Sequence, residues 1–85
     1  MTNIVIYTRP GCGFCTQAKQ LLSSKGKKFD EFNIWSSDKI NAEMRKRTGG
    51  ASSVPQIFID DDHIGGCDDL FVLERAGHLD ALLNQ

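Results

Sequence analysis

Two kinds of hydrophobic pattern alternate along this 85-residue chain. The first is a short, continuous run of apolar and β-branched residues at Ile4–Tyr7, which is typical of a strand buried on both faces of a sheet. The second is a set of apolar positions at helical spacing between Cys12 and Ser24, after which Gly26 acts as a helix stop. The chain therefore begins with a strand that is followed directly by a helix.

The rest of the chain continues this alternation. The further predicted elements are a less buried strand at residues 29–34, a helix from Ser36 or Ser37 to about Thr48, a strand at 56–59, a turn at 60–62, a short strand at 63–64 broken by Gly65 and Gly66, a helix with Asp68 and Asp69 in its first turn, and a last helical turn at 79–83. Two parallel strands joined by a helix, followed by an antiparallel hairpin, fit an α/β fold with a four-stranded mixed sheet flanked by helices. A chain this short has room for one domain, 1–85.

Composition and charge exclude several classes of function. Hydrophobic residues make up 40% and charged residues 25% of the chain, which is ordinary for a globular protein and argues against disorder. The formal net charge is −1, whereas nucleic-acid and membrane-surface proteins usually need a strong basic excess. No apolar stretch approaches the ~20 residues of a membrane span, and the first residues lack the features of a signal peptide. We therefore expect a cytoplasmic protein without nucleic-acid or membrane partners.

The strongest chemical signal is Cys12-Gly13-Phe14-Cys15, directly after the first strand. At positions i and i+3 of a helix the two sulfurs share one face and lie close enough to form a disulfide. Cys12 lies at the helix N-terminus, where unpaired N–H groups and the macrodipole favour an anion, so we expect a lowered pKa for its thiol. Cys15 lies one turn deeper. The pattern predicts a redox pair in which Cys12 attacks and Cys15 resolves.

Other interpretations stay open at this point. An odd number of cysteines in a chain without a secretion signal does not suggest a structural disulfide framework. The Cys pair could instead be half of a zinc site completed by His63 and Cys67, although structural zinc ligands usually come as two closely spaced pairs. Arg9 could add a positive charge near the thiolate, or it could hold a carboxylate of the substrate. The simpler interpretation is an ordinary solvated residue.

Three motifs, in order and over essentially the whole chain, resemble the small, dithiol, bacterial type of glutaredoxin. They are Tyr7-Thr8-Arg9 leading into the Cys12–Cys15 pair, Ser53-Val54-Pro55-Gln56-Ile57-Phe58-Ile59, and Gly65-Gly66-Cys67-Asp68-Asp69-Leu70. Together they are far more specific than a C-x-x-C pair alone. The thioredoxin pattern, with Trp before the first Cys and Gly-Pro between the pair, is absent. The resemblance implies a thioredoxin-like fold and glutathione as the thiol reductant.

By this resemblance, one part of the glutathione site lies around the proline of the second motif. Pro55 is the cis proline of the fold and turns the Val54 backbone toward Cys12, where a free N–H and C=O can pair with an extended tripeptide. From the residues alone, an ordinary trans proline is the expectation. Arg9 is then near the glycyl carboxylate, and Phe14 forms an apolar wall beside the sulfur or simply packs on its helix.

The third motif supplies the other part of the implied site. Gly66 lets a ligand approach the backbone, and the first N–H groups of the following helix receive the γ-glutamyl carboxylate. Asp68 meets the ammonium group of glutathione; the simpler alternative is that Asp68 and Asp69 only stabilise the helix start. Cys67 lines the site through its backbone and is otherwise a small packing residue.

The sequence departs from the commonest dithiol pattern between the two cysteines. Where many family members have Pro-Tyr, this chain has Gly13 and Phe14, and Gly13 leaves the turn looser. Cys-Gly-Phe also begins the motif of the monothiol, iron–sulfur relatives, although these have Ser in place of Cys15 and extra residues before the Cys. An alternative function is therefore a dimer in which two chains and two glutathiones hold a [2Fe–2S] cluster.

The sequence thus predicts a glutathione-dependent thiol–disulfide oxidoreductase. It is expected to be a monomer with no tightly bound cofactor or metal, with glutathione as co-substrate, and with protein partners that carry glutathione mixed disulfides or disulfides. Cys12 attacks the mixed disulfides, and Cys15 joins it for protein disulfides. Of the remaining residues, Trp35 is expected to pack after the second strand, and His63 shows no obvious partner. The basic runs at 25–28 and 45–47 are expected to be solvated.

Overall fold

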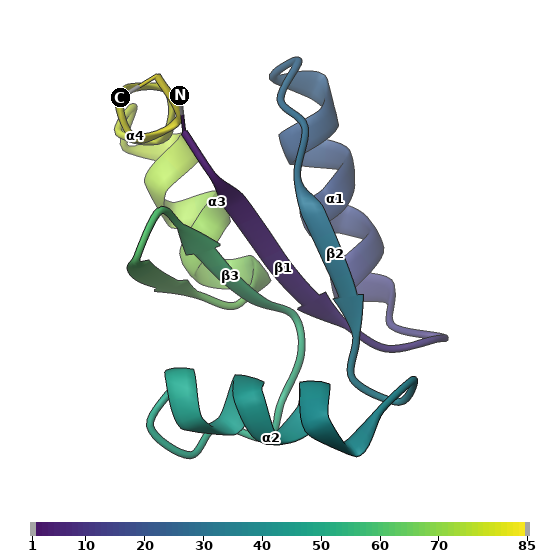
Figure 1. The fold of residues 1–85 in the computed structure, drawn as a ribbon. Coiled ribbons are helices and arrows are strands. Elements are labelled where there is room, and N and C mark those ends of the chain that lie inside the picture. The colour runs from purple at the N-terminus through teal and green to yellow at the C-terminus, as the bar shows by residue number, and fades with distance from the viewer. Residues whose placement is uncertain (1, 85) are drawn as a thin grey trace.

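The computed structural model describes residues 2–84. Its elements, in chain order, are β1 (Ile4–Thr8), α1 (Gly13–Ser24), β2 (Asp30–Asn33), α2 (Asp38–Arg47), β3 (Gln56–Ile59), β4 (Asp62–Gly65), α3 (Cys67–Arg75) and α4 (Leu79–Leu83). The strands form a sheet in the order β2-β1-β3-β4, in which β1 pairs in parallel with β2 while β3 pairs antiparallel with β1 and β4 (Figure 1). The prediction of an α/β fold with a four-stranded mixed sheet is therefore confirmed.

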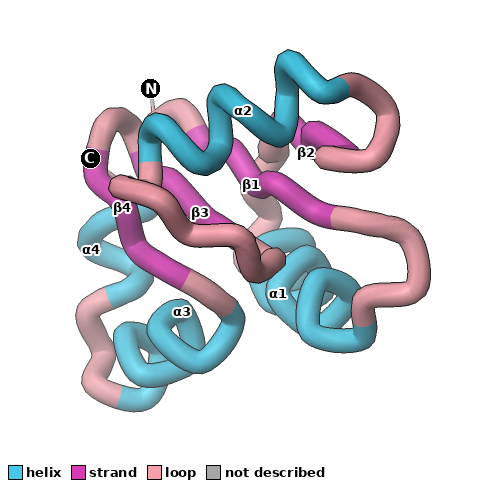
Figure 2. The backbone as a smooth tube through the Cα atoms, turned by 90° about the horizontal axis from the view of Figure 1, so that it is seen from below, coloured by secondary structure: helices cyan, strands magenta, loops and turns pink. Residues whose placement is uncertain are grey.

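Different helices cover the two faces of the sheet. Because successive side chains of a strand point to opposite sides, β1 contributes residues to a buried cluster on each face. On one face, Ile4 and Ile6 of β1 join a buried cluster with residues of α1 and α3. On the other face, Val5 and Tyr7 pack with Met44 of α2. Figure 2 shows α2 on one side of the sheet, with α1 and α3 on the other. The helices thus bury both faces of the central strand.

The strand register brings the three sequence motifs to one end of the sheet. Tyr7 pairs with Gln56, and Ile57 pairs with Gly65. Since β3 runs antiparallel to both of its neighbours, its start lies beside the ends of β1 and β4. The loop before α1, the segment before β3 and the start of α3 therefore meet, although they are far apart in the sequence.

β4 is longer than predicted in both directions. The turn predicted at 60–62 is limited to Asp60 and Asp61, since Asp62 already belongs to β4. Gly65, predicted to break the strand, is its last residue. A register shift opposite Ile57 and Phe58 puts one extra residue into β4, which bends the strand without ending it.

The expectation that Trp35 packs after the second strand is wrong, because its side chain is 65% exposed. The chain leaves β2 in a tight turn, in which the Asn33 side chain accepts a hydrogen bond from the Trp35 N–H at 2.8 Å. This turn holds the indole outside the core. The preceding residue, Ile34, takes the buried position instead.

In the basic runs, expected to be solvated, Arg47 is exposed and Lys25 is partly exposed, and both residues also contact other elements. Lys25 pairs with Glu74 at 2.8 Å, and it also pairs with Asp80. The Arg47 guanidinium carbon lies 3.9 Å from the centroid of the Phe58 ring, which gives the cation an aromatic face that the sequence pattern did not reveal.

Candidate active site around the cysteine pair

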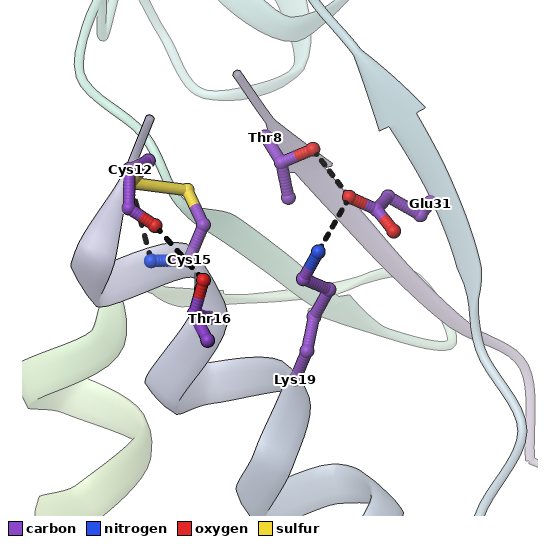
Figure 3. A network of polar contacts seen from close by, with 6 residues as sticks. All are labelled: Thr8, Cys12, Cys15, Thr16, Lys19 and Glu31. Atoms are coloured by element: carbon purple, nitrogen blue, oxygen red, sulfur yellow. Dashed lines mark hydrogen bonds and ion pairs between the residues drawn. A yellow bond between two sulfur atoms is a disulfide. The ribbon is translucent and has the colours of Figure 1, made fainter. Parts of the chain in front are cut away.

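Cys12 and Cys15 form a disulfide at the start of α1 (Figure 3). Their Cα atoms are 5.2 Å apart, in the range that a pair at i and i+3 is expected to reach. Gly11, with a φ of +73°, turns the chain from β1 into the helix. Cys12 is the N-cap, and its Sγ accepts a hydrogen bond from the Cys15 N–H at 3.1 Å. The first turn of α1, which the structure describes in full, holds no acidic side chain.

The two cysteines differ in their access to solvent and in what they face. Cys12 is 8% exposed and Cys15 is 2% exposed. The Val54–Pro55 peptide bond is cis, and the Val54 carbonyl oxygen lies 3.9 Å from Cys12 Sγ. Cys12 is therefore the cysteine that borders both solvent and the segment before β3.

A groove of about 400 Å³ extends from Phe14 and the Val54–Pro55 segment to the start of α3. Of the residues predicted to bind glutathione, all but Arg9 line it; they are Phe14, Val54, Pro55, Gly66, Cys67 and Asp68. The Phe14 side chain is 60% exposed, which fits a wall of the groove better than packing on its own helix.

The two aspartates at the start of α3 have different surroundings. The Asp69 carboxylate accepts a hydrogen bond from the Gly66 N–H at 3.0 Å and so caps the helix. Gly65 has a φ of +114°, and a Cβ there would clash with the same carboxylate. Asp68 is exposed at the groove, and within residues 2–84 its carboxylate has no hydrogen-bond or ion-pair partner. The capping interpretation therefore applies to Asp69, and Asp68 remains available to a ligand.

Cys67 is the first residue of α3 and is 5% exposed. It lines the groove and also belongs to the buried cluster on the α1 face of the sheet. Burial raises the pKa of its thiol, and the negative charge of Asp68 raises the pKa further. A thiol in this environment stays protonated at neutral pH, as a packing residue should.

A second cleft, of about 430 Å³, is lined by both cysteines of the disulfide and includes Arg9. In it, Thr8 Oγ1 donates to Glu31 Oε2 at 2.8 Å, and Lys19 Nζ lies 3.0 Å from the same oxygen (Figure 3). Burial alone would raise the pKa of Glu31, but the hydrogen bonds from Thr8 and Lys19 outweigh it and leave the pKa below its ordinary value. The carboxylate is thus a poor base for the neighbouring thiols at neutral pH.

Comparison with known proteins identifies the family. The family model described as Glutaredoxin matches residues 4–64. The chain belongs to the glutaredoxin family. It is 53% identical over 83 residues to glutaredoxin 3 of Escherichia coli K12, covering 98% of this chain and 99% of that protein. It is 49% identical over 84 residues to glutaredoxin of Pseudomonas aeruginosa, covering 99% of each. Glutaredoxins are oxidoreductases, so this chain is one, with a disulfide-forming cysteine pair.

Solved glutaredoxin structures share the fold, which is thioredoxin-like. The solution structure of glutaredoxin from Brucella melitensis has a TM-score of 0.84 and 49% identity, and the match covers 98% of this chain and 89% of that one. The crystal structure of a buckwheat glutaredoxin–glutathione complex has a TM-score of 0.87 and 30% identity, and the match covers 98% of this chain and 77% of that one.

Arg9 of this glutaredoxin lies apart from the groove. Its Nη1 donates to the Pro10 carbonyl at 3.2 Å, and its guanidinium carbon lies 5.6 Å from the centroid of the Trp35 ring. The fold therefore brings Arg9 to the cysteine pair through the second cleft, and not to the residues that line the groove.

Sequence reasoning missed Gln56 and His63, which also line the groove. His63 Nε2 lies 2.7 Å from Gln56 Oε1, so the expectation that His63 has no partner is wrong; the β3–β4 pairing puts the two residues on one face of the sheet. One signal could have found Gln56. It is a polar residue at the start of the otherwise apolar strand run 56–59, directly after a proline.

Within residues 2–84, no three His, Cys, Asp or Glu side chains gather so as to hold a metal ion. The ring of His63, a ligand in the zinc interpretation, faces Gln56. In the same described range, no helix has the length and apolar character of a membrane span.

Proposed function

We propose that this glutaredoxin reduces glutathione mixed disulfides with Cys12 as the nucleophile, and protein disulfides with Cys12 and Cys15 together. One observation carries the proposal: Cys12 Sγ receives the Cys15 N–H at the start of α1 and lies 3.9 Å from the carbonyl oxygen of Val54 in the groove. A thiolate is favoured at this position, because the helix start is electropositive and no acidic side chain of the first turn competes for it.

The groove supports glutathione as the ligand. An extended tripeptide can pair with the Val54 backbone as an added strand does. Its γ-glutamyl carboxylate can meet the N–H groups of Cys67 and Asp68 in the first turn of α3, and its ammonium group can meet the Asp68 carboxylate. The complex of buckwheat glutaredoxin with glutathione supports the same ligand here.

Three further residues have proposed parts in holding the tripeptide. Phe14, largely exposed on the groove, would cover the glutathione sulfur. Gly66 lets the ligand approach the backbone, since a Cβ there would lie 3.4 Å from the Pro55 carbonyl oxygen and narrow the groove. Arg9 is the proposed partner of the glycyl carboxylate, as the exposed cation beside the cysteine pair.

The proposed reaction is a sequence of thiol–disulfide exchanges. The Cys12 thiolate attacks the glutathionyl sulfur of a protein mixed disulfide; a bond forms between these two sulfurs, and the protein leaves as a thiolate that takes a proton from water. A second glutathione, as thiolate, attacks the same glutathionyl sulfur, which releases glutathione disulfide and restores the Cys12 thiolate. With a protein disulfide, the Cys12 thiolate attacks one protein sulfur, and the other protein sulfur leaves as a thiolate. Cys15, as thiolate, then attacks Cys12 Sγ, which releases the second protein thiolate and leaves the Cys12–Cys15 disulfide. Two glutathiones reduce this internal disulfide and become glutathione disulfide.

A glutathione-coupled assay with a small glutathione mixed disulfide tests this proposal. Cys12→Ser is expected to abolish turnover, because no nucleophile remains. Cys15→Ser is expected to retain deglutathionylation and to lose the reduction of protein disulfides, because only the resolving thiol is removed. Turnover by the Cys12→Ser protein would overturn the assignment.

We also propose that the protein works in the cytoplasm as a monomer, with glutathione as co-substrate and without a tightly bound cofactor. Its mass in solution tests the monomeric state. Its visible spectrum after anaerobic reconstitution with iron, sulfide and glutathione tests the absence of a tightly bound cofactor. A colourless monomer is expected. A coloured dimer would favour the alternative, a [2Fe–2S] cluster held by two Cys12 thiolates and two glutathiones.

A further inference from the structure

We propose that Gln56 is a positioning residue for the groove: together with His63 it holds the Ser53–Pro55 segment so that the Val54 backbone faces the bound tripeptide. The inference rests on the proposed function, since it concerns the segment with which glutathione would pair. Gln56 lies within the second motif, but no role was predicted for its side chain from the sequence.

The first observation is the bond that Gln56 makes back to the segment. Gln56 Nε2 donates to the Ser53 carbonyl at 3.0 Å and lies 3.3 Å from Ser53 Oγ. The side chain therefore closes a loop around Val54 and Pro55. Gln56 itself is 6% exposed and anchored in β3, where it pairs with Tyr7 of the central strand. The loop is thus tied to the central strand of the sheet through this pairing.

The second observation fixes which way the amide points. A carbonyl oxygen such as that of Ser53 only accepts hydrogen bonds, so the Gln56 nitrogen must face it. Gln56 Oε1 then faces His63 Nε2 at 2.7 Å, and His63 must carry a proton on that nitrogen. His63 thereby holds the acceptor end of the amide while the donor end holds Ser53.

The third observation is that His63 is itself held in place. Its ring stacks on Phe58 with the centroids 4.8 Å apart and the planes 22° apart. Phe58 is 2% exposed and is its partner in the β3–β4 register. A chain of contacts thus runs from the core through His63 and Gln56 to the segment before β3.

The held segment is the one whose position matters for the proposed chemistry. The Val54 carbonyl lies 3.9 Å from Cys12 Sγ, so a shift of this backbone would move the paired tripeptide relative to the attacking sulfur. Pairing by an added strand also requires a backbone that is fixed before the ligand arrives, because otherwise binding must order it. Loss of the Gln56 contacts should therefore weaken binding and leave the sulfur itself unchanged.

The test compares Gln56→Met and Gln56→Glu with Gln20→Met, a matched change on an exposed position of α1. Methionine keeps the length but removes the hydrogen bonds to Ser53 and to His63; glutamate keeps the acceptor for His63 but cannot donate to Ser53. Both Gln56 variants should raise KM for the mixed disulfide of glutathione and mercaptoethanol about fivefold, with kcat within about twofold of wild type. Alkylation of reduced Cys12 by iodoacetamide, which needs no groove, should change less than about twofold. Gln20→Met should behave as wild type.

Two results would overturn the inference. One is an unchanged KM in both Gln56 variants. The other is a joint change of KM, kcat, alkylation rate and unfolding temperature, which would mark Gln56 as a general structural residue. If circular dichroism shows that the Gln56 variants do not fold, variants of His63 test the inference instead. His63→Leu should raise KM. His63→Gln, which can still donate a hydrogen bond to Gln56, should have a KM close to that of the wild type. Equal KM values in that pair would also contradict the inference.

A separate variant distinguishes a failure of the proposed function. Asp68→Asn removes the charge proposed for the glutathione ammonium group without touching Gln56. A raised KM in Asp68→Asn with an unchanged KM in the Gln56 variants would leave glutathione binding in place and reject the positioning role alone. A wild-type protein that does not turn over the glutathione mixed disulfide would reject the proposed function, and the positioning role with it.

Discussion

The starts of α1 and α3 make an instructive comparison, because each places a cysteine at a helix N-terminus. Cys67 lines the groove, whereas Cys12 lines the second cleft and its Sγ lies 3.9 Å from the carbonyl oxygen of Val54, a groove residue. At α1, Cys12 is the N-cap and its sulfur receives the Cys15 N–H, with no acidic residue in the first turn. At α3, the Asp69 carboxylate receives the cap N–H of Gly66, and burial together with Asp68 raises the pKa of Cys67. We therefore expect a helix start to favour a thiolate where an amide N–H faces the sulfur and no carboxylate competes with it.

The largest expected difference is in the reactivity of the two thiols. Since burial and Asp68 hold the pKa of the Cys67 thiol above its ordinary value, this thiol stays almost wholly protonated at pH 7, and iodoacetamide should modify reduced Cys12 at least about tenfold faster than Cys67. Between pH 7 and 8 the Cys67 rate should rise about tenfold, because its thiolate fraction rises with pH, while the Cys12 rate stays nearly constant. Peptide mass mapping after timed alkylation measures both rates. Equal rates at pH 7 would contradict the comparison.

Gly65→Ala is designed to remove the Asp69 cap at the start of α3. It forces a side chain into a φ of +114° and against the Asp69 carboxylate, so the cap should be lost and the free energy of unfolding should fall by about 1–3 kcal/mol. Urea denaturation gives the value. Gly13→Ala is the control, since Gly13 has no positive φ and its new Cβ would meet no atom within 4 Å. A loss of stability of the same size in both variants would argue against the cap as the cause.

Gly13→Asp makes the α1 start resemble the α3 start. A carboxylate in the first turn competes for the positive helix end and should raise the pKa of the Cys12 thiol, so alkylation at pH 7 should slow by about twofold to fivefold. Gly13→Asn, of similar size and without charge, should alkylate at close to the wild-type rate. If the two variants slow equally, bulk and not charge is responsible.

Asp68→Asn is expected to have the smallest effect on thiol reactivity. It removes a negative charge beside Cys67 but leaves the burial that is the main cause of the raised pKa, so Cys67 alkylation should speed up by less than about threefold. The Cys12 rate should not change and serves as the internal control. A larger increase for Cys67 would mean that charge, and not burial, keeps this thiol protonated.

Much of the fold was predictable because local pattern and tertiary packing agree. The run Ile4–Tyr7 is apolar on both sides because both faces of β1 are covered, and the helix after it has the expected cysteine, Cys12, as its N-cap. The disagreements lie where a contact from another element overrides the local pattern. Trp35 is exposed because Asn33 shapes the turn after β2, and β4 continues to Gly65 because a register shift opposite β3 accommodates an extra residue.

The site was predictable to the extent that motifs carry it. Six of the predicted groove residues carry a motif signal and line the groove, whereas Arg9, close in sequence to Cys12, lines the second cleft. The contact between Gln56 and His63 could not be predicted from the sequence, because it depends on the register between β3 and β4. Pairing registers are set by packing, which a single sequence does not display.

Local chemistry along the chain already determined the order of the elements, the cysteine at the first helix start and the third motif's glycine-aspartate turn. Only the tertiary structure decided which aspartate is a cap and which is free, how deeply each cysteine is buried, and that Arg9 lines the second cleft and not the groove. The physical reason is that helix capping and apolar periodicity act over a few residues, whereas burial and side-chain pairing depend on antiparallel strands that bring distant segments to one end of the sheet.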